Sequence, residues 1–312
     1  MQRLQVIFVA IVSLLLISAS ACSGAPAAVA TPPSAPKVVT PASTPAKVAL
    51  SASVPAGKQF EDLDPNSFAR STTINNEWFP LKPGTQSVFE GYTDEGGQAV
   101  HHRLVFAVTD LTKMIEGVRT VVAWIVDYSN DQLVEKEISF YAQDNDGTVW
   151  YLGEYPEAYQ DGQFVEAPTW IHGLEDARAG ITMKAKPQLG MPSYSAGWGP
   201  AVNFTDRAQV SQMGQRTSVP FCNYENVLVI AESGQGELNA FQLKYYARGV
   251  GKVRVGWRGA DATQETLELV DLVQLSPEAL AQIRTAALEL EKHAYEISKD
   301  VYGRTTPAES AK

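Results

Sequence analysis

Few side chains in this sequence have the types and spacing that catalysis or metal binding requires. Asp144-Asn145-Asp146-Gly147 resembles the start of a calcium loop, but the later oxygen ligands and terminal Glu of an EF-hand loop are missing. This stretch is better explained as a hairpin turn. His101 and His102 are adjacent, and on a strand they point to opposite faces, so they cannot easily share a metal ion. We therefore expect neither a metal site nor a cofactor.

A second set of candidates surrounds an irregular region, 174–204, that is rich in Gly and Pro. Long irregular segments in compact domains are often functional, so one hypothesis is an envelope hydrolase that uses this region with His172 and Asp176. However, Ser193 and Ser195 have no recognisable base, and neither a nucleophile elbow nor a phosphate-binding glycine loop occurs. The acidic residues are spread along faces expected to be solvated, so no pair can be nominated for acid–base work. The sequence favours a non-enzymatic protein.

The remaining candidates are aromatic side chains that could line an apolar groove, with core packing as the alternative use. Such a groove would bind a hydrophobic small molecule or a segment of a partner, and few charged groups would converge on it. The candidates are Trp124, Trp150, Tyr151, Trp170 and Trp198.

The elements that position these side chains are predicted to be strands. Region 133–155 has an alternating run, the Asp144–Gly147 turn and an aromatic run, which together predict a hairpin. Segment 118–128 is apolar on both faces, which places it near the middle of a sheet with both faces covered. Further strands are predicted at 86–93, 100–109, 208–218, 227–232, 238–247, 252–258 and 266–274, a short one at 181–185, and an edge strand or loop at 163–172.

The chain changes period after residue 275. Ser276-Pro277-Glu278 is typical of a helix start, and apolar residues then recur at spacings of three and four until Gly303. We expect this amphipathic helix, 276–303, to cover a sheet face, with a coiled-coil partner as the alternative. Strands first, one helix last and no βαβ alternation predict a mainly β fold, one antiparallel sheet (59–275) packed with one helix.

The N-terminus has the pattern of an exported, lipid-anchored protein. Arg3 precedes an apolar run, 6–17, that is too short for a typical spanning helix. Ala19-Ser20-Ala21-Cys22 looks like a bacterial lipobox, so residues 1–21 are predicted to be a signal peptide and Cys22 to be lipidated. The alternative is an ordinary secretion signal that is cleaved near Ala21 and leaves Cys22 unmodified.

Residues 22–58 are rich in Ala, Pro, Ser, Thr and Val and contain no acid and no aromatic residue. This composition predicts a disordered tether, which at about 3.1 Å per residue could reach roughly 110 Å from a membrane. Residues 59–312 have 21 Lys and Arg against all 35 Asp and Glu, a net charge of −14. Such an acidic domain is a poor partner for nucleic acid.

If Cys22 carries lipid, Cys222 has no disulfide partner, so stability must come from packing. Cys222 is best explained as a small buried apolar group, with a reactive thiol or a link between molecules as alternatives. We expect a monomer and a short disordered tail at 304–312.

Three segments resemble a group of secreted bacterial proteins of uncertain role. They are Trp78-Phe79-Pro80-Leu81-Lys82-Pro83-Gly84-Thr85, then 219–229 (VPFCNYENVLV), then 244–253 (KYYARGVGKV). They are similar to the "FPLKPG", "PxGxFxNVLxV" and "YYAPGVGxV" segments of that group, except that Cys222 stands in place of Gly and Arg248 in place of Pro. The resemblance implies a strongly curved sheet, like the half-barrel of the periplasmic lipoprotein carriers.

The sequence thus predicts a non-enzymatic extracytoplasmic lipoprotein, anchored to a bacterial membrane through Cys22. It would bind a hydrophobic ligand or an envelope protein. The alternatives are the hydrolase that uses region 174–204 and a purely structural or interaction lipoprotein.

Overall fold

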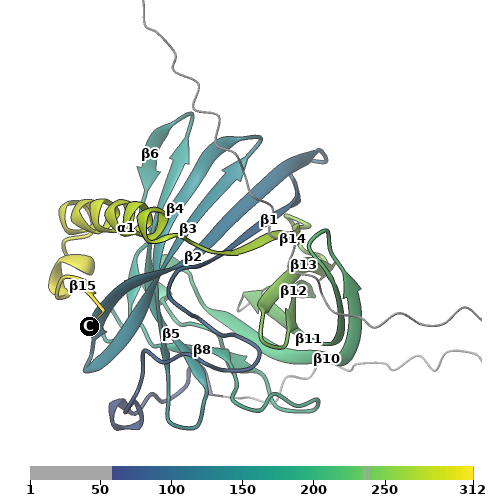
Figure 1. Ribbon diagram of the computed structural model, residues 1–312, viewed down its shortest axis with the longest axis horizontal. Coiled ribbons are helices and arrows are strands. Elements are labelled where there is room, and N and C mark those ends of the chain that lie inside the picture. The colour runs from purple at the N-terminus through teal and green to yellow at the C-terminus, as the bar shows by residue number, and fades with distance from the viewer. Residues whose placement is uncertain (1–57, 235–236, 238, 312) are drawn as a thin grey trace, which may run out of the picture. The chain divides into compact units, whose positions relative to one another are not determined.

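The alternating runs of the sequence form one curled antiparallel sheet (Figure 1). The computed structural model describes residues 58–234, 237 and 239–311. The expected signal peptide, Cys22 and almost all of the predicted tether lie outside these residues. Within them the sheet has 15 strands, and one long helix follows it. The predicted fold class, a mainly β protein with one curved antiparallel sheet and a C-terminal helix, is confirmed.

Five long strands form the first half of the sheet: β1 (Thr85–Asp94), β2 (Ala99–Ile115), β3 (Val118–Ser129), β4 (Gln132–Gln143) and β5 (Val149–Gln160). Five more form the second half: β10 (Asp206–Ser218), β11 (Asn223–Gly234), β12 (Ala240–Ala247), β13 (Gly251–Gly259) and β14 (Thr266–Gln274). In the sequence, four short strands come between the two halves: β6 (Gln163–Glu166), β7 (Trp170–Ile171), β8 (Gly180–Met183) and β9 (Tyr194–Ser195).

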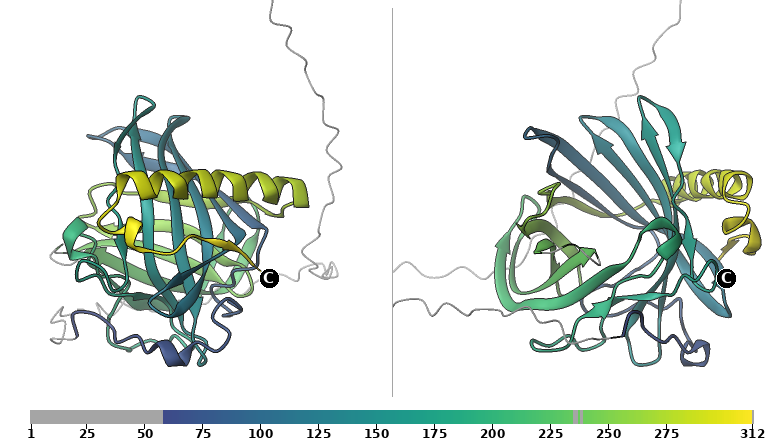
Figure 2. Two further views of the ribbon diagram at one scale, coloured as in Figure 1. Left: turned by 90° about the vertical axis from the view of Figure 1, so that its left-hand side faces the viewer. Right: turned by 180° about the vertical axis from the view of Figure 1, so that it is seen from behind.

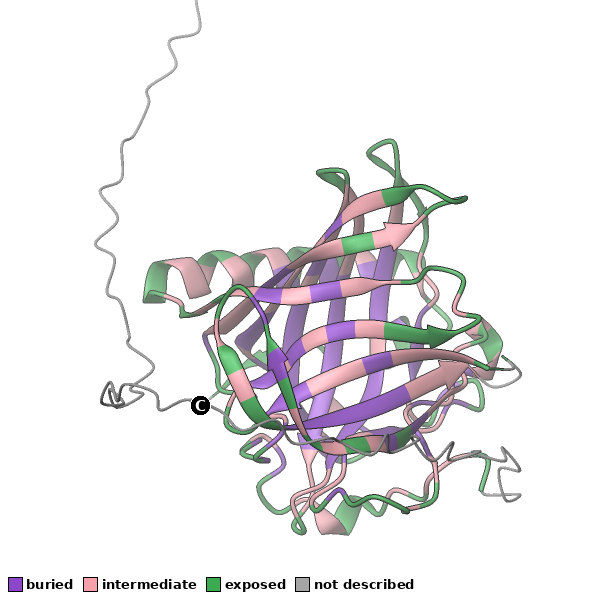
Figure 3. Cartoon of the chain, turned by 90° about the vertical axis from the view of Figure 1, so that its right-hand side faces the viewer, coloured by how far each residue is buried: buried purple, intermediate pink, exposed green. Residues whose placement is uncertain are grey.

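The strand order runs β6-β5-β4-β3-β2-β1-β14-β13-β12-β11-β10-β9. β7 and β8 pair with β5, off this path. The pairing of β1 with β14 joins the two halves, so the second half curls round to lie across from the first (Figures 1 and 2). The outer strands β6 and β9 are not paired with each other, so the sheet stays open. Along the second half, buried positions alternate with half-buried and exposed ones (Figure 3).

The hairpin predicted at 133–155 forms as β4 and β5. The turn between β4 and β5 is closed by Asp144, whose Oδ1 accepts hydrogen bonds from the backbone N–H groups of Asp146 and Thr148. Gly147 adopts a positive φ of 95°, which glycine allows without strain. The segment before β1, which contains the 3-10 helix η1 (Pro65–Ser67), packs against this turn through a hydrogen bond from Asn145 N–H to the Ser67 carbonyl.

Helix α1 (Pro277–Ile297) lies across the outer side of the sheet, against β2 and β4 (Figure 2). The hydroxyl of Ser276 accepts a hydrogen bond from Ala279 N–H, as the helix-start signal predicts. The helix ends at Ile297 instead of near Gly303. The apolar spacing continues beyond this end because Tyr302, in the 3-10 helix η3 (Tyr302–Arg304), packs back into the same core. No helix within the described residues is both long and apolar enough to cross a membrane.

A buried ion pair attaches the helix to the sheet. Lys113 of β2 is fully buried, and its Nζ lies 2.8 Å from Glu291 Oε1 on α1. The same ammonium donates to the carbonyl of Thr306 at 2.6 Å and lies 4.3 Å from the ring centre of Tyr302. The Tyr302 hydroxyl also donates to Glu291 at 2.9 Å. Helix, tail and sheet therefore share one polar contact under the helix.

The prediction of a disordered tail at 304–312 is wrong for the described residues. β15 (Glu309–Ser310) pairs with β2, and Ala308 N–H donates to both carboxylate oxygens of Glu291. The tail has no strong apolar pattern of its own. It is ordered because its backbone groups satisfy the buried Lys113–Glu291 pair.

Replacing Glu291 with Met should destabilise the fold by about 3–5 kcal/mol, because Lys113 keeps a buried charge without its partner. Chemical unfolding of the full-length protein measures this change. The double variant Lys113→Met/Glu291→Met should be more stable than Glu291→Met alone, since it removes both charges. A single variant as stable as the wild type would contradict the structural role of the pair.

Candidate functional site

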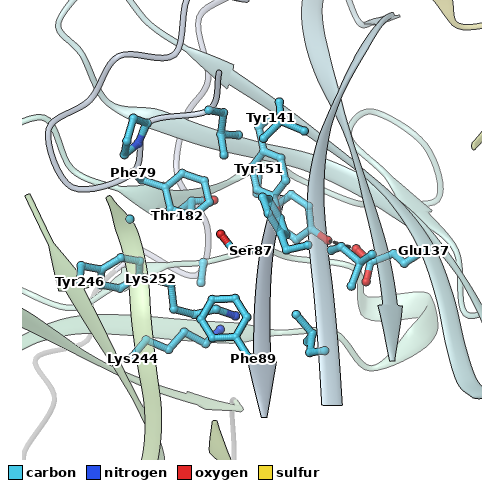
Figure 4. Close-up of a pocket in the computed structure, with 18 of the residues that line it drawn as sticks. Phe79, Ser87, Phe89, Glu137, Tyr141, Tyr151, Thr182, Lys244, Tyr246 and Lys252 are labelled. Carbon is cyan, nitrogen blue, oxygen red and sulfur yellow. Dashed lines mark hydrogen bonds between the residues drawn. The ribbon is translucent and has the colours of Figure 1, made fainter. Parts of the chain in front are cut away.

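A cavity of about 260 Å³ lies on the inner side of the curled sheet (Figure 4). Its size is close to the lower end of the range for small-molecule sites, roughly 300–1,000 Å³. β1–β5 supply one wall and β10–β13 the other, and the corner before β1 closes one end. We call this space the inner cavity.

The terminal helix packs on the sheet, as expected, but not on the face that lines the cavity. No residue of α1 lines the inner cavity, because successive residues of a strand face opposite sides of the sheet. Phe140 of β4 faces the helix side and packs against Tyr302, with ring centres 6.2 Å apart. Tyr141, the next residue, lines the cavity. Helix and cavity therefore lie on opposite faces of β4.

Two of the segments that resemble the secreted group meet at one end of the inner cavity. Phe79, Pro80 and Leu81 line it from the corner before β1, and Val250 and Gly251 line it from the turn before β13. The two segments are joined by a hydrogen bond from Gly249 N–H to the Glu77 carbonyl and by Arg248, whose guanidinium lies 4.3 Å from the Trp78 ring centre. Gly84 completes the corner with a positive φ of 83° and donates to the Val108 carbonyl.

The β4–β5 side of the cavity is a layer of packed aromatic rings. Tyr141 and Tyr151 are stacked, with ring centres 4.9 Å apart and planes at 10°. Trp170 packs edge-on against Tyr151 at 5.2 Å and stacks on Phe204 at 5.1 Å. These contacts fix the ring positions, so this wall is rigid and largely apolar.

Of the five predicted groove residues, Tyr151 lines the inner cavity. Trp170 lies behind it. Trp124 is on the face of β3 opposite to the cavity-lining Ile125. Trp150 donates its indole N–H to Asp144 Oδ2 at 2.8 Å, and Trp198 packs near Phe60. These four tryptophans are packing residues, the alternative use expected for them.

Two carboxyl groups also line the cavity: the buried Glu137 of β4 and the half-buried Glu154 of β5. The Tyr151 hydroxyl contacts both of them: it donates to Glu154 Oε2, and it lies 3.2 Å from Glu137 Oε1. Ser139 donates to Glu137, and Trp170 donates its indole N–H to Glu154 at 2.9 Å. No Lys, Arg or His of the described chain forms an ion pair with either carboxyl group.

These surroundings favour the neutral form of the carboxyl groups. Burial raises the pKa of Glu137, although hydrogen bonds from Ser139 and Tyr151 act against the shift. Burial and the charge of Glu137 raise the pKa of Glu154 well above its ordinary value of 4.5. Burial and Glu137 likewise raise the pKa of Glu135, two residues earlier on β4, to about 8. Burial therefore shifts both cavity carboxyl groups toward the neutral form.

Two lysines reach into the cavity from the other wall (Figure 4). Lys244 of β12 is paired with Glu232 of β11 at 2.5 Å, and despite burial this carboxylate raises the pKa of Lys244. Lys252 of β13 lies with its Nζ 5.2 Å from the ring centre of Phe89. Burial and the charge of Lys244 lower the pKa of Lys252 to about 8.

The expectation that few charges converge on the groove is wrong. Six acidic or basic side chains line the inner cavity: Glu137, Glu154, Asp206, Glu232, Lys244 and Lys252. The sequence does contain their signal, because Glu137 and Lys244 occupy the polar positions of alternating strands. Those positions suggested faces exposed to solvent, whereas the curl of the sheet turns them toward a shared interior.

The residues of the hydrolase hypothesis are not brought together. Nδ1 of His172 accepts a hydrogen bond from Ala179 N–H at 3.2 Å, and burial lowers the pKa of His172. Asp176 is exposed in a turn, and no hydrogen bond or ion pair joins it to His172 in the described chain. His172 instead lines a separate pocket of about 200 Å³, next to Glu116 and Arg304.

The other residues considered for metal binding or for thiol chemistry lie apart. His101 contacts Glu90 at 2.8 Å, and His102 contacts Asp127 at 2.5 Å. Among the residues with described positions, no cluster of three or more His, Cys, Asp or Glu could hold a metal ion. Cys222 is half-buried in the turn between β10 and β11.

Neither a family model nor a curated protein matches this chain. Two solved structures are similar to it. One is a Bacteroides fragilis protein that is provisionally described as exported and as having a YmcC-like fold. Its sequence is 13% identical and the TM-score is 0.38, and the match covers 64% of this chain and 99% of that one. A provisionally described lipoprotein of Parabacteroides distasonis is 14% identical with a TM-score of 0.34, over 65% and 100%. These scores are too low to transfer a function.

Replacing Glu137 or Glu154 with Gln should stabilise the protein increasingly as the pH rises. The folded state holds the protons of these two carboxyl groups more tightly than the unfolded state does. Their contribution to wild-type stability is therefore greatest below the ordinary pKa of 4.5 and falls as the pH increases. Thermal unfolding of the full-length variants from about pH 4 to pH 8 should show little difference at the acid end and a growing gain above it.

The matched control is Glu166→Gln, an exposed glutamate on β6. Its difference from the wild type should be small at every pH. A Glu137→Gln gain that is independent of pH, or that shrinks as the pH rises, would contradict the raised pKa of the cavity carboxyl groups.

Proposed function

We propose that this protein is a non-enzymatic, lipid-anchored protein of the cell envelope that binds a small amphipathic molecule in the inner cavity. The inner cavity is the observation that carries the proposal. Its wall of stacked rings fits an apolar group, and the ionisable side chains that share the space fit a polar group on the same molecule.

The anchor part of the proposal rests on the sequence of residues 1–58. The lipobox at 19–22 and the Pro-rich tether that follows it suit a domain held at a distance from a bacterial membrane. The acidic charge of the rest of the chain argues against nucleic acid as the partner. The geometry around His172 gives no support to the hydrolase alternative, since its two proposed residues are not in contact.

A larger side chain at Ser87 should abolish ligand binding. Ser87 lies on β1 and points into the inner cavity, so Ser87→Phe fills the space that a ligand needs (Figure 4). Full-length wild-type protein purified from its own host should carry a small molecule that solvent extraction and mass spectrometry detect. The Ser87→Phe protein should carry at least about tenfold less of it, equivalent to about 1.4 kcal/mol of binding energy.

Gln86→Phe is the matched control, because the neighbouring residue on β1 faces the other side of the sheet. It should retain the molecule at the wild-type level. Equal amounts of every extracted species in wild type and Ser87→Phe would contradict binding in the inner cavity.

Replacing Cys22 with Ala should release the protein from the membrane. The thiol of Cys22 is the predicted acylation site, so the variant cannot receive a lipid through it. Metabolic labelling with an alkyne fatty acid, followed by cell fractionation, measures both label and location. Cys222→Ala should keep label and membrane location, whereas a Cys22→Ala protein that is still labelled would refute the lipobox assignment.

A further inference from the structure

Lys252 differs from the other lysine of the inner cavity, because among the described residues no carboxylate forms an ion pair with it. Lys244 lies 2.5 Å from a carboxylate oxygen of Glu232. Within the part of the chain that the structure describes, no carboxylate lies within 4.0 Å of the Lys252 ammonium. Its nearest aromatic neighbour is Phe89, which is itself buried.

The carboxylates that attract Lys252 from a longer distance are already engaged elsewhere. Glu232 is paired with Lys244. Glu265, just before β14, lies 3.1 Å from His102 Nδ1 and accepts a hydrogen bond from Gln242. Asp127 of β3 lies 2.5 Å from His102 Nε2. Neutralising Lys252 with any of these groups would break an existing pair.

Lys252 is half-buried, and an ammonium group that is partly removed from water without a counter-ion is unfavourable for folding. The opposite wall repels an anion less than two ordinary carboxylates would, because burial raises the pKa of both Glu137 and Glu154. One part of the cavity thus has an uncompensated positive charge, and another has an apolar ring stack.

We propose that the ligand of the inner cavity has an acidic group, a carboxylate or a phosphate, which pairs with Lys252, and an apolar part that lies against Tyr141 and Tyr151. This inference rests on the proposed binding function and adds the chemical class of the ligand. Lys252 binds the ligand directly, and Glu232 supports it by keeping Lys244 paired.

Three ten-carbon probes test the inference: decanoate, decyl phosphate and uncharged decanol. Full-length protein is placed in lipid nanodiscs, and the amount of bound probe is measured by equilibrium dialysis. The amount bound to nanodiscs that carry the Ser87→Phe protein is subtracted as background. Wild-type protein should bind at least one of the two acidic probes about tenfold more tightly than decanol, since a charge-assisted hydrogen bond is made only with the acids. The preferred acid then identifies the headgroup as a carboxylate or a phosphate.

The variants isolate the charge of Lys252. Lys252→Met should lose about tenfold or more in affinity for the preferred acid and keep the affinity for decanol. Lys252→Arg should retain most of the acid binding, and Lys82→Met, at an exposed position before β1, should change nothing. The comparison of acids with decanol in the wild type needs no variant, so a misfolded Lys252→Met protein does not remove the test.

Two results would overturn the inference, and they differ in meaning. If decanol binds the wild type as tightly as both acids, or if a folded Lys252→Met protein binds the acids normally, the acidic ligand is wrong while cavity binding stands. If none of the three probes binds in excess of the Ser87→Phe control, the proposed binding function fails together with the inference.

Discussion

The curl of one antiparallel sheet is the constraint on which the other features depend. Because β1 pairs with β14, the second half of the sheet is carried across from the first, and the inner side chains of both halves meet. These side chains do not fill the space between the walls, and the inner cavity remains. The corner at 78–85 and the turn before β13 close one end, held together by the contacts of Glu77 and Trp78 with Arg248 and Gly249.

The outer face of the sheet is stabilised separately. Helix α1 and the C-terminal tail are attached to β2 through Lys113 and Glu291, and this contact shares no residue with the cavity lining. A buried ion pair of this kind contributes more to defining one arrangement than to total stability, because both charges lose their hydration. The helix therefore covers the outer face, on the side of the sheet opposite to the inner cavity.

The ionisable side chains on the two walls of the cavity differ in their ion pairing. On β4 and β5, carboxyl groups lie close together without a cation, so burial shifts them toward the neutral form. On β12 and β13, one lysine is paired and the other is not. The inner cavity combines a surface of packed aromatic rings with a few polar groups.

The sequence by itself determined the local features. Alternation and turn residues predicted the strands and the β4–β5 hairpin, the Ser276-Pro277-Glu278 start predicted α1, and the N-terminal pattern predicts export and lipidation. Only the tertiary structure decided which polar positions are interior. A period of two shows that a strand has two faces but not what each face meets, so Glu137 and Lys244 were assigned to solvent. They line a cavity because strands about a hundred residues apart in the sequence face each other. The order of the tail depends in the same way on a partner, Lys113, that is distant in the sequence.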